Sequence, residues 1–280
     1  MKRLVLIGTL LSLFVISMPV RTHCEEPSVR YRGGITFIQD TAHWGTVYAH
    51  VIYDPIDDRK KTQFEFLSVG EKVRHYGGHG NYQVDSLCRA EPERMSKMSS
   101  EEYIALLKQS ETIPENLLFN TQDSIVTYHG KIFINHYRYF EPVPKFEWKL
   151  EDETMTVLGY ECHKATTRWR GRDWIAWYAD IPLSAGPWKF HGLPGLILQL
   201  EDSNKEHYFE AIDFVEETFP VGYRKKLYCK TTREKFNSEL DEFMNNAGDV
   251  MLSSGMMKVI DGDEKRMRKV RLFFNPIELE

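Results

Sequence analysis

The chain has 280 residues, 42% of them hydrophobic and 28% charged, a composition typical of a globular protein large enough to bury a core. Its formal net charge is −5 at pH 7 and no dense basic patch offsets it, so nucleic acid is not expected as a partner. Aromatic residues make up 13% of the chain, which favours strands because these side chains pack well on pleated sheets.

The N-terminal segment has the pattern of a secretory signal peptide. Two basic residues precede an apolar run at residues 4–20, and polar residues follow it. We therefore predict a signal peptide at residues 1–24 and a single β-rich domain at residues 25–280. A lipid on Cys24 and retention of the apolar run as a membrane anchor remain alternatives. The protein is expected to be exported to the periplasm or cell envelope, with no other membrane contact.

The chain contains four cysteines, Cys24, Cys88, Cys162 and Cys229. Export permits a disulfide, because extracytoplasmic compartments are oxidising. If Cys24 leaves with the signal peptide, three cysteines remain, and one bridge is possible in three pairings. We favour Cys162–Cys229 because both cysteines lie in strand-like segments.

Strand-like segments dominate the chain. Alternating patterns predict strands at residues 43–54 and 61–70, joined by an Asp-Pro turn. Glycine-containing or polar turns predict three hairpins further along. These are residues 123–140 turning at His129-Gly130, residues 160–179 turning at residues 170–173, and residues 196–214 turning at residues 202–205. Adjacent hairpins indicate an antiparallel meander.

Two capping boxes predict helices. Ser99 with Glu102 begins one helix, and Thr231 with Glu234 begins another over residues 232–247. Gly248 is the expected terminator of the second helix.

Together, these elements predict an α+β fold, mainly antiparallel β. In it, a curved meander sheet has two or more helices packed on or beside it. The Gly-rich tract at residues 76–81 and the Pro-rich tract at residues 140–146 are the best boundaries, but both are too short for a flexible linker.

The most unusual stretch of the sequence contains two turns followed by an apolar run. Leu193-Pro194-Gly195-Leu196 suits a type II turn, with glycine where φ must be positive. The run that follows is typical of a strand with both faces covered. The segment is either a rigid, buried corner of the sheet or an exposed loop that docks a ligand or partner. Its signature residues are Gly186, Pro187, Trp188, Gly192, Leu193, Pro194, Gly195, Leu196 and Ile197.

Several blocks of sequence, in order, resemble the GLPGLI family of exported proteins, which is found chiefly in Bacteroidetes and named for this hexapeptide. The blocks are FEWKL (146–150), VLGYECHKAT (157–166), the long segment at 170–202, and NPIEL (275–279). They span the second half of the chain. The resemblance identifies residues 25–280 as a GLPGLI-type domain, and it implies no established activity and no catalytic residues.

One hairpin is a candidate ligand surface. Arg168, Arg170 and Arg172, together with Trp174 and Trp177, are candidates for a cation–π and anion-binding surface. The alternative is a structural ladder of arginines over tryptophans.

Nucleophile signals are weak. Cys162 and its neighbour His163 point to opposite faces of one strand, which is poor geometry for a nucleophile and its base. Ser184 lacks a neighbouring signature and is expected to be a turn residue. Nucleophile-elbow, P-loop and dinucleotide-binding motifs are missing, so no catalytic residue and no cofactor are predicted.

Histidine pairs are the only metal candidates. His75 and His79 are spaced like ligands in the Gly-rich loop HYGGHG at residues 75–80, and His43 and His50 lie on a predicted strand. A pair of histidines without a further ligand motif does not define a site, so we predict no metal.

Three functions remain open. The favoured one is an exported binding or accessory protein whose curved sheet holds an apolar or peptide ligand, or an envelope partner. The second is an enzyme whose site is assembled from scattered residues, although the missing motifs favour a protein that is not an enzyme. The third is a structural assembly factor of the envelope.

Overall fold

The computed structural model describes most of the chain downstream of the predicted signal peptide. The described residues are 5–6, 37–111, 113–224, 226–255, 257–259 and 264–280. Cys24 and the rest of the predicted signal peptide lie outside them, apart from the two-residue strand β1 (Val5–Leu6), which pairs with β15 (Met257–Lys258). No helix within the described part of the chain is long and apolar enough to cross a bilayer.

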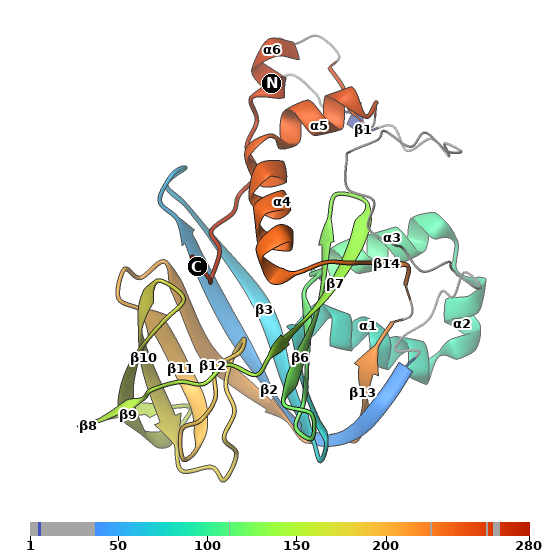
Figure 1. The fold of residues 1–280 in the computed structure, drawn as a ribbon. Coiled ribbons are helices and arrows are strands. Elements are labelled where there is room, and N and C mark those ends of the chain that lie inside the picture. Colours follow the sequence, from blue (N-terminus) through green and yellow to red (C-terminus); the bar gives the residue numbers. More distant parts are fainter. Residues whose placement is uncertain (1–4, 7–36, 112, 225, 256, 260–263) are drawn as a thin grey trace.

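One curved sheet organises the molecule (Figure 1). Its strands are β2 (Phe37–Asp54), β3 (Arg59–Gly70), β4 (Val73–Gly78), β5 (Asn116–Asn120), β6 (Ile125–Ile132), β7 (Asn135–Pro142), β8 (Lys149–Val157), β9 (Tyr160–Trp169), β10 (Arg172–Ala179), β11 (Leu196–Asp202), β12 (His207–Val215), β13 (Phe219–Tyr223) and β14 (Tyr228–Lys230). They follow the order β14-β7-β6-β5-β4-β3-β2-β12-β11-β10-β9-β8, and β13 also pairs with β2. All pairs are antiparallel except β14 with β7, so the predicted fold class is confirmed.

Six helices accompany the sheet in the described part of the chain. They are α1 (His79–Ala90), α2 (Pro92–Lys97), α3 (Ser100–Gln109), α4 (Arg233–Asn245), α5 (Ala247–Ser253) and α6 (Glu264–Arg268). Helix α1 packs on β3 and β4, and α4 packs on β6 and β7. The two helices cover opposite faces of the sheet, because Tyr82 of α1 stacks on Phe66 whereas Phe236 of α4 meets Tyr128 and Tyr139.

The first predicted helix start is confirmed and the second is wrong by one residue. Ser99 Oγ accepts from the Glu102 amide, and the Glu102 carboxylate accepts from the Ser99 amide, which is a complete capping box. The cap of α4 is Thr232, whose hydroxyl accepts from the Lys235 amide. Gly248 does not end this helix but lies inside α5, where an added Cβ would meet the Met267 carbonyl oxygen at 1.9 Å.

Two predicted hairpins form with the expected turns, β9–β10 and β11–β12. The third, β6–β7, forms with a different turn. Its strands pair as far as Ile132 with Asn135, so the turn lies beyond His129-Gly130, which sit inside β6. Gly130 is needed there for close packing, because an added Cβ would lie 2.6 Å from the Tyr128 ring and 2.8 Å from the Phe236 ring.

Strand alternation divides the core between the two faces. The larger cluster lies on the face covered by α4. It includes Tyr48, Tyr76, Tyr128, Trp174 and the apolar signature residues Leu193, Leu196 and Ile197. A smaller cluster lies on the face covered by α1 and is centred on Phe66.

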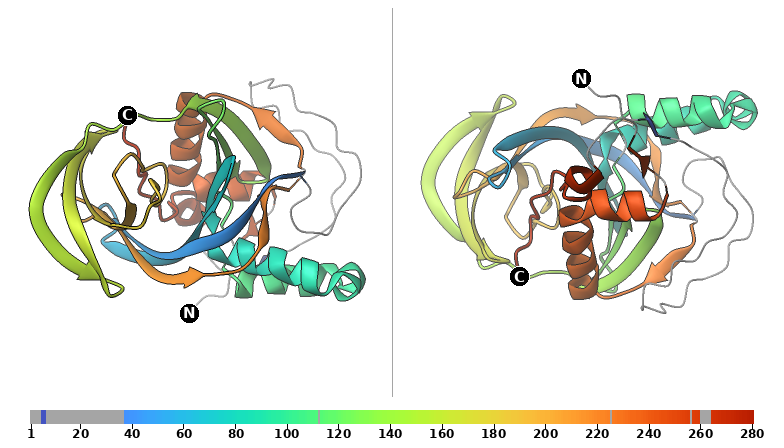
Figure 2. Two further views of the ribbon diagram at one scale, coloured as in Figure 1. Left: turned by 90° about the horizontal axis from the view of Figure 1, so that it is seen from below. Right: turned by 90° about the horizontal axis from the view of Figure 1, so that it is seen from above.

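The predicted Cys162–Cys229 disulfide is wrong. Cys162 is a free, buried thiol that donates to the carbonyl of Tyr160 at 3.6 Å. Cys162 lies on β9 and Cys229 on β14, near opposite ends of the strand order. Figure 2 shows β8–β10 and β6–β7 on opposite sides of the molecule. A disulfide requires Cα atoms within about 7 Å, which this separation prevents.

Candidate functional site

The signature segment forms a buried corner between β10 and β11. Phe190, Leu196 and Ile197 are fully buried in the larger core cluster, and Leu193 is 2% exposed. Two hydrogen bonds connect later residues of the corner to its first residues. The Ile197 amide donates to the Ala185 carbonyl, and the Gly192 amide donates to the Ser184 hydroxyl. The geometry agrees with the interpretation of these residues as an architectural corner.

The predicted type II turn at Leu193–Leu196 is wrong. Gly195 does not have a positive φ; in this segment φ is positive at Trp188 (53°) and Gly192 (93°). Gly195 is required for another reason, since an added Cβ would lie 1.8 Å from the carbonyl oxygen of Ala179 at the end of β10. The glycine therefore permits a close approach of two backbones.

The sequence blocks that carry the family resemblance meet at this corner. Phe146 of the first block stacks on Phe190, and Trp148 donates to the His191 carbonyl at 2.8 Å. From the C-terminal block, Glu278 accepts from the Trp188 indole at 2.9 Å. Blocks far apart in sequence thus build one structural unit.

A buried ionic cluster lies beneath the corner; we call it the Lys189 cluster. The Lys189 side chain is 0% exposed, and its ammonium forms ion pairs with Glu141 and, at 2.6 Å, with Glu278. These contacts are ion pairs rather than aligned hydrogen bonds. Arg170 and Arg233 approach the same two carboxylates from the outside.

The predicted arginine surface does not form. Arg168 pairs with Asp173 at the surface, and Arg170 belongs to the Lys189 cluster. Arg172 is buried, and its two terminal nitrogens donate to Asp202, Glu206, Asn275 and the Pro276 carbonyl, while its Nε has no hydrogen-bond partner in the described structure.

Two of the three tryptophans of that hairpin, Trp174 and Trp177, also point apart. Trp174 is 1% exposed within the core, and Trp177 lies under the ammonium of Lys164. The third, Trp169, has the Arg170 guanidinium 5.7 Å from its ring centre, so a single cation–π contact takes the place of a shared arginine and tryptophan surface.

The histidine pairs proposed as metal ligands are also separated. His43 bonds to Thr218 at the surface, whereas His50 is buried and bonds to His207 at 3.0 Å and Glu65 at 3.3 Å. His79 packs against Tyr82. Among the described residues, no group of three or more His, Cys, Asp or Glu side chains could hold a metal ion.

A pocket opens on the opposite face of the sheet, under α1. Its floor is one row of cross-strand neighbours, in which Phe66 pairs with Gly77, Gly77 with Asn116, and Asn116 with His129. The space directly over Gly77 is filled, since an added Cβ would lie 3.2 Å from His75 Nε2 and 3.3 Å from the Glu115 carbonyl oxygen. A small cavity lies beside this row and is lined by Phe66, Gly77, Asn116 and His129. We call this cavity of about 70 Å³ the row pocket; it has room for several water molecules or a small ligand.

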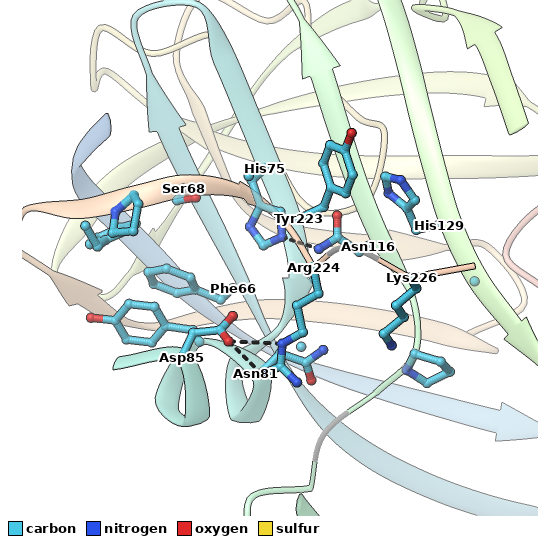
Figure 3. Close-up of a pocket in the computed structure, with 18 of the residues that line it drawn as sticks. Phe66, Ser68, His75, Asn81, Asp85, Asn116, His129, Tyr223, Arg224 and Lys226 are labelled. Atoms are coloured by element: carbon cyan, nitrogen blue, oxygen red, sulfur yellow. Dashed lines mark hydrogen bonds and ion pairs between the residues drawn. The ribbon is translucent and has the colours of Figure 1, made fainter. Parts of the chain in front are cut away.

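The walls of the row pocket come from three further segments (Figure 3). Helix α1 supplies Asn81, Tyr82, Asp85 and Arg89, the loop before β5 supplies Pro114, and the chain from β13 to β14 supplies Phe219, Pro220, Gly222, Tyr223, Arg224, Lys226 and Tyr228. Ser68, His75, Gly78, Gly130 and His136 complete the lining.

Polar atoms on the floor lack protein partners. His129 is 3% exposed, yet neither ring nitrogen has a hydrogen-bond partner in the described structure. Its ring stacks on Tyr223 at 4.8 Å and lies 4.7 Å from Tyr228. The Asn116 amide nitrogen donates to His75 Nε2 at 2.9 Å, and its buried carbonyl oxygen is unpartnered. Unpartnered buried polar groups cost free energy, so they are uncommon in folded proteins.

Burial keeps the pocket histidines neutral near pH 7. Burial, together with nearby cations, lowers the pKa of His129 to about 3, and burial lowers the pKa of His75 to about 4. At the mouth, Arg224 pairs with Asp85 at 2.6 Å and also bonds to the Tyr103 hydroxyl.

The sequence held only partial signals for this pocket. The Gly-rich tract that looked like a boundary supplies Gly77, His75 comes directly before it, and the pair assigned to a turn supplies His129. Cross-strand register brings these residues together. Register depends on where each hairpin turns, and the turn predicted at His129-Gly130 was in the wrong place.

Acid is expected to destabilise the protein through the buried histidines. The unfolded chain binds protons below a histidine pKa of about 6.5, whereas folded His129 binds one only near its lowered pKa of about 3. The contribution of His129 to stability is therefore fully present above pH 6.5. It decreases by up to about 1.4 kcal/mol per pH unit as the pH falls from 6.5 toward about 3. Urea unfolding at pH 7, 6 and 5 measures the slope.

His129→Phe is expected to raise the free energy of unfolding at pH 7 by about 1–3 kcal/mol. The ring volume and the stacking on Tyr223 remain, while two buried nitrogens without partners are removed. The same variant should show a shallower loss of stability between pH 6.5 and 5. Urea unfolding checks both effects, with His43→Phe at an exposed strand position as the control. Destabilisation would show that the nitrogens of His129 have partners in solution.

The fold and its pocket define a mainly antiparallel α+β protein of unknown function. A family model described as "Protein of unknown function (Porph_ging)" matches residues 169–199, which confirms the resemblance to a Bacteroidetes-associated, GLPGLI-type family that the sequence predicted. No curated protein matches the chain.

Two solved structures of PNGF-II, in space groups P21 and C2, are distantly similar. Each has a TM-score of 0.45, with 13% and 14% sequence identity over 73% of this chain. The chain spans about a third of their length, 34% and 33% respectively.

Proposed function

We propose that this chain is an exported ligand-binding protein and that the row pocket holds its ligand. The observation that carries the proposal is the pair of unpartnered nitrogens on buried His129, in the lining of this pocket. A neutral imidazole has one donor and one acceptor, and a ligand in the pocket can satisfy both. The N-terminal basic and apolar pattern supports export.

The location and chemistry of this pocket differ from the site expected from the sequence. We expected an apolar or peptide ligand, or an envelope partner, on a curved sheet face. The face covered by α4 is filled by the core and the signature corner. The row pocket combines aromatic walls with a polar floor, which is typical of sites that orient small polar ligands.

Native mass spectrometry of the protein purified from its own envelope fraction tests the proposal. We expect a retained small molecule in the unmodified protein and in the His43→Phe control, and its loss in His129→Phe, although that variant is the more stable. Retention of the same molecule by His129→Phe would overturn the proposed site. Recovery of the protein from the cytoplasm instead of the envelope would contradict the export part.

One observation favours a second candidate, an enzyme. Ser68 lies directly across the strand register from His75, whose Nε2 accepts a hydrogen bond from the Asn116 amide, and serine, histidine and asparagine can form a nucleophilic set. In the described structure, however, Ser68 and His75 share no hydrogen bond. If Ser68→Ala retained the ligand but stopped its turnover, the enzyme would replace the binding protein.

A further inference from the structure

We infer that the ligand of the row pocket is a small hydroxylated anion, with neutral hydroxyl groups at the floor and one anionic group at the mouth. This inference rests on the proposed function, since it names the ligand class of the same pocket. Three features support it: the unpartnered atoms of the floor, the uncompensated charge at the mouth, and the aromatic walls.

The unpartnered atoms on the floor of the row pocket fit a ligand group that both donates and accepts hydrogen bonds. Asn116 uses its amide nitrogen on His75, which leaves its buried carbonyl oxygen to accept from a ligand. Neutral His129 offers one donor and one acceptor. A hydroxyl can donate to Asn116 and accept from His129, or bond to His129 through its other ring nitrogen, whereas a carboxylate can only accept.

The mouth carries uncompensated positive charge. Asp85 is the one acidic residue in the lining, and Arg224 neutralises it at 2.6 Å. Arg89 and Lys226 are exposed at the rim, and neither forms a hydrogen bond or ion pair within the described part of the chain. An ammonium ligand would satisfy Asn116 but would be repelled by these cations, so an anionic group fits the mouth better.

The walls between floor and mouth are aromatic. Tyr223 and Tyr228 flank His129 on one side, while Phe66, Tyr82 and Phe219 form a second aromatic group. Figure 3 shows Tyr223, His129 and Lys226 around the same opening. Such surfaces pack against the apolar faces of a ring, so the hydroxyl and anionic groups are best carried by a compact ring.

Isothermal titration calorimetry with matched probes tests the ligand class. D-glucuronate carries hydroxyls and a carboxylate, D-glucose lacks the charge, and cyclohexanecarboxylate lacks the hydroxyls; glucose 6-phosphate distinguishes a phosphate from a carboxylate. We expect glucuronate or glucose 6-phosphate to bind at least tenfold more tightly than the other two. Lys226→Gln should weaken only the anionic probes, by about tenfold, and added salt should do the same.

The outcomes separate the two proposals. Equal affinity for glucose and glucuronate would overturn the anionic part, and equal affinity for cyclohexanecarboxylate and glucuronate would overturn the hydroxyl part. If no probe binds, the ligand class is wrong, while a different molecule retained by the protein and lost in His129→Phe would leave the proposed function intact. Probe binding that is unaffected by His129→Phe would place the ligand elsewhere and overturn both.

Discussion

Replacing Lys189 with methionine is expected to lower the free energy of unfolding by about 3–5 kcal/mol. The substitution keeps the buried stem and removes the ammonium that lies between Glu141 and Glu278. Both carboxylates then remain in a largely dry site, with only the flanking arginines to compensate them. Removing one member of a buried ionic group costs more than the group contributes as a whole, because the remaining charge is left without its partner.

Urea unfolding of two further variants makes this prediction specific. Arg168→Ala removes an exposed ion pair, in which the side chains are 70% and 58% exposed, and should cost at most about 1 kcal/mol. The double variant Lys189→Met with Glu278→Gln should lose less free energy of unfolding than the two single variants lose together. The expected difference is about 0.5–3 kcal/mol. Additive costs would show that Lys189 and Glu278 are not coupled.

Gly195→Ala is expected to destabilise the fold by about 3–5 kcal/mol, and so to reduce the yield of folded protein. The new Cβ would lie 1.8 Å from the Ala179 carbonyl oxygen. Because that oxygen belongs to the backbone, it cannot move aside as a flexible side chain can, so the start of β11 must shift away from the end of β10.

Gly159→Ala is the matched control. Gly159 has a φ of 79° and nothing within 4 Å of an added Cβ, so alanine there should cost only the strain of the left-handed conformation, about 1–2 kcal/mol. The ratio of the two costs tests the assignment. If Gly195→Ala costs no more than Gly159→Ala in urea unfolding, close backbone packing is not the reason for glycine at position 195.

These two positions give the family signature a physical meaning. Gly195 lets two strands converge, and Lys189 ties the corner to Glu278 in the C-terminal block. Apart from exposed Gly192 and Pro194, the signature is buried or half-buried, and its apolar side chains face the core on the side of the sheet opposite to the row pocket. The candidate ligand site uses residues outside this segment.

Local patterns in the sequence were sufficient for the fold class, the hairpins at residues 160–179 and 196–214, and the capping box at Ser99. Each depends on residues within a few positions of one another, where alternation, turn residues and caps act directly on the backbone. The same local rules gave the wrong result where glycine serves packing instead of conformation, as at Gly130 and Gly195.

The tertiary structure alone decided which residues share a site. His129 and Asn116 are cross-strand neighbours, Gly77 is the next residue along the same row, and Lys189 meets Glu278 across a long stretch of sequence. Such neighbours follow from strand register and sheet curvature, and a shift of one residue moves every side chain of a strand to the other face. The sequence by itself thus determined the elements and the family, whereas register brought together the row pocket and the Lys189 cluster.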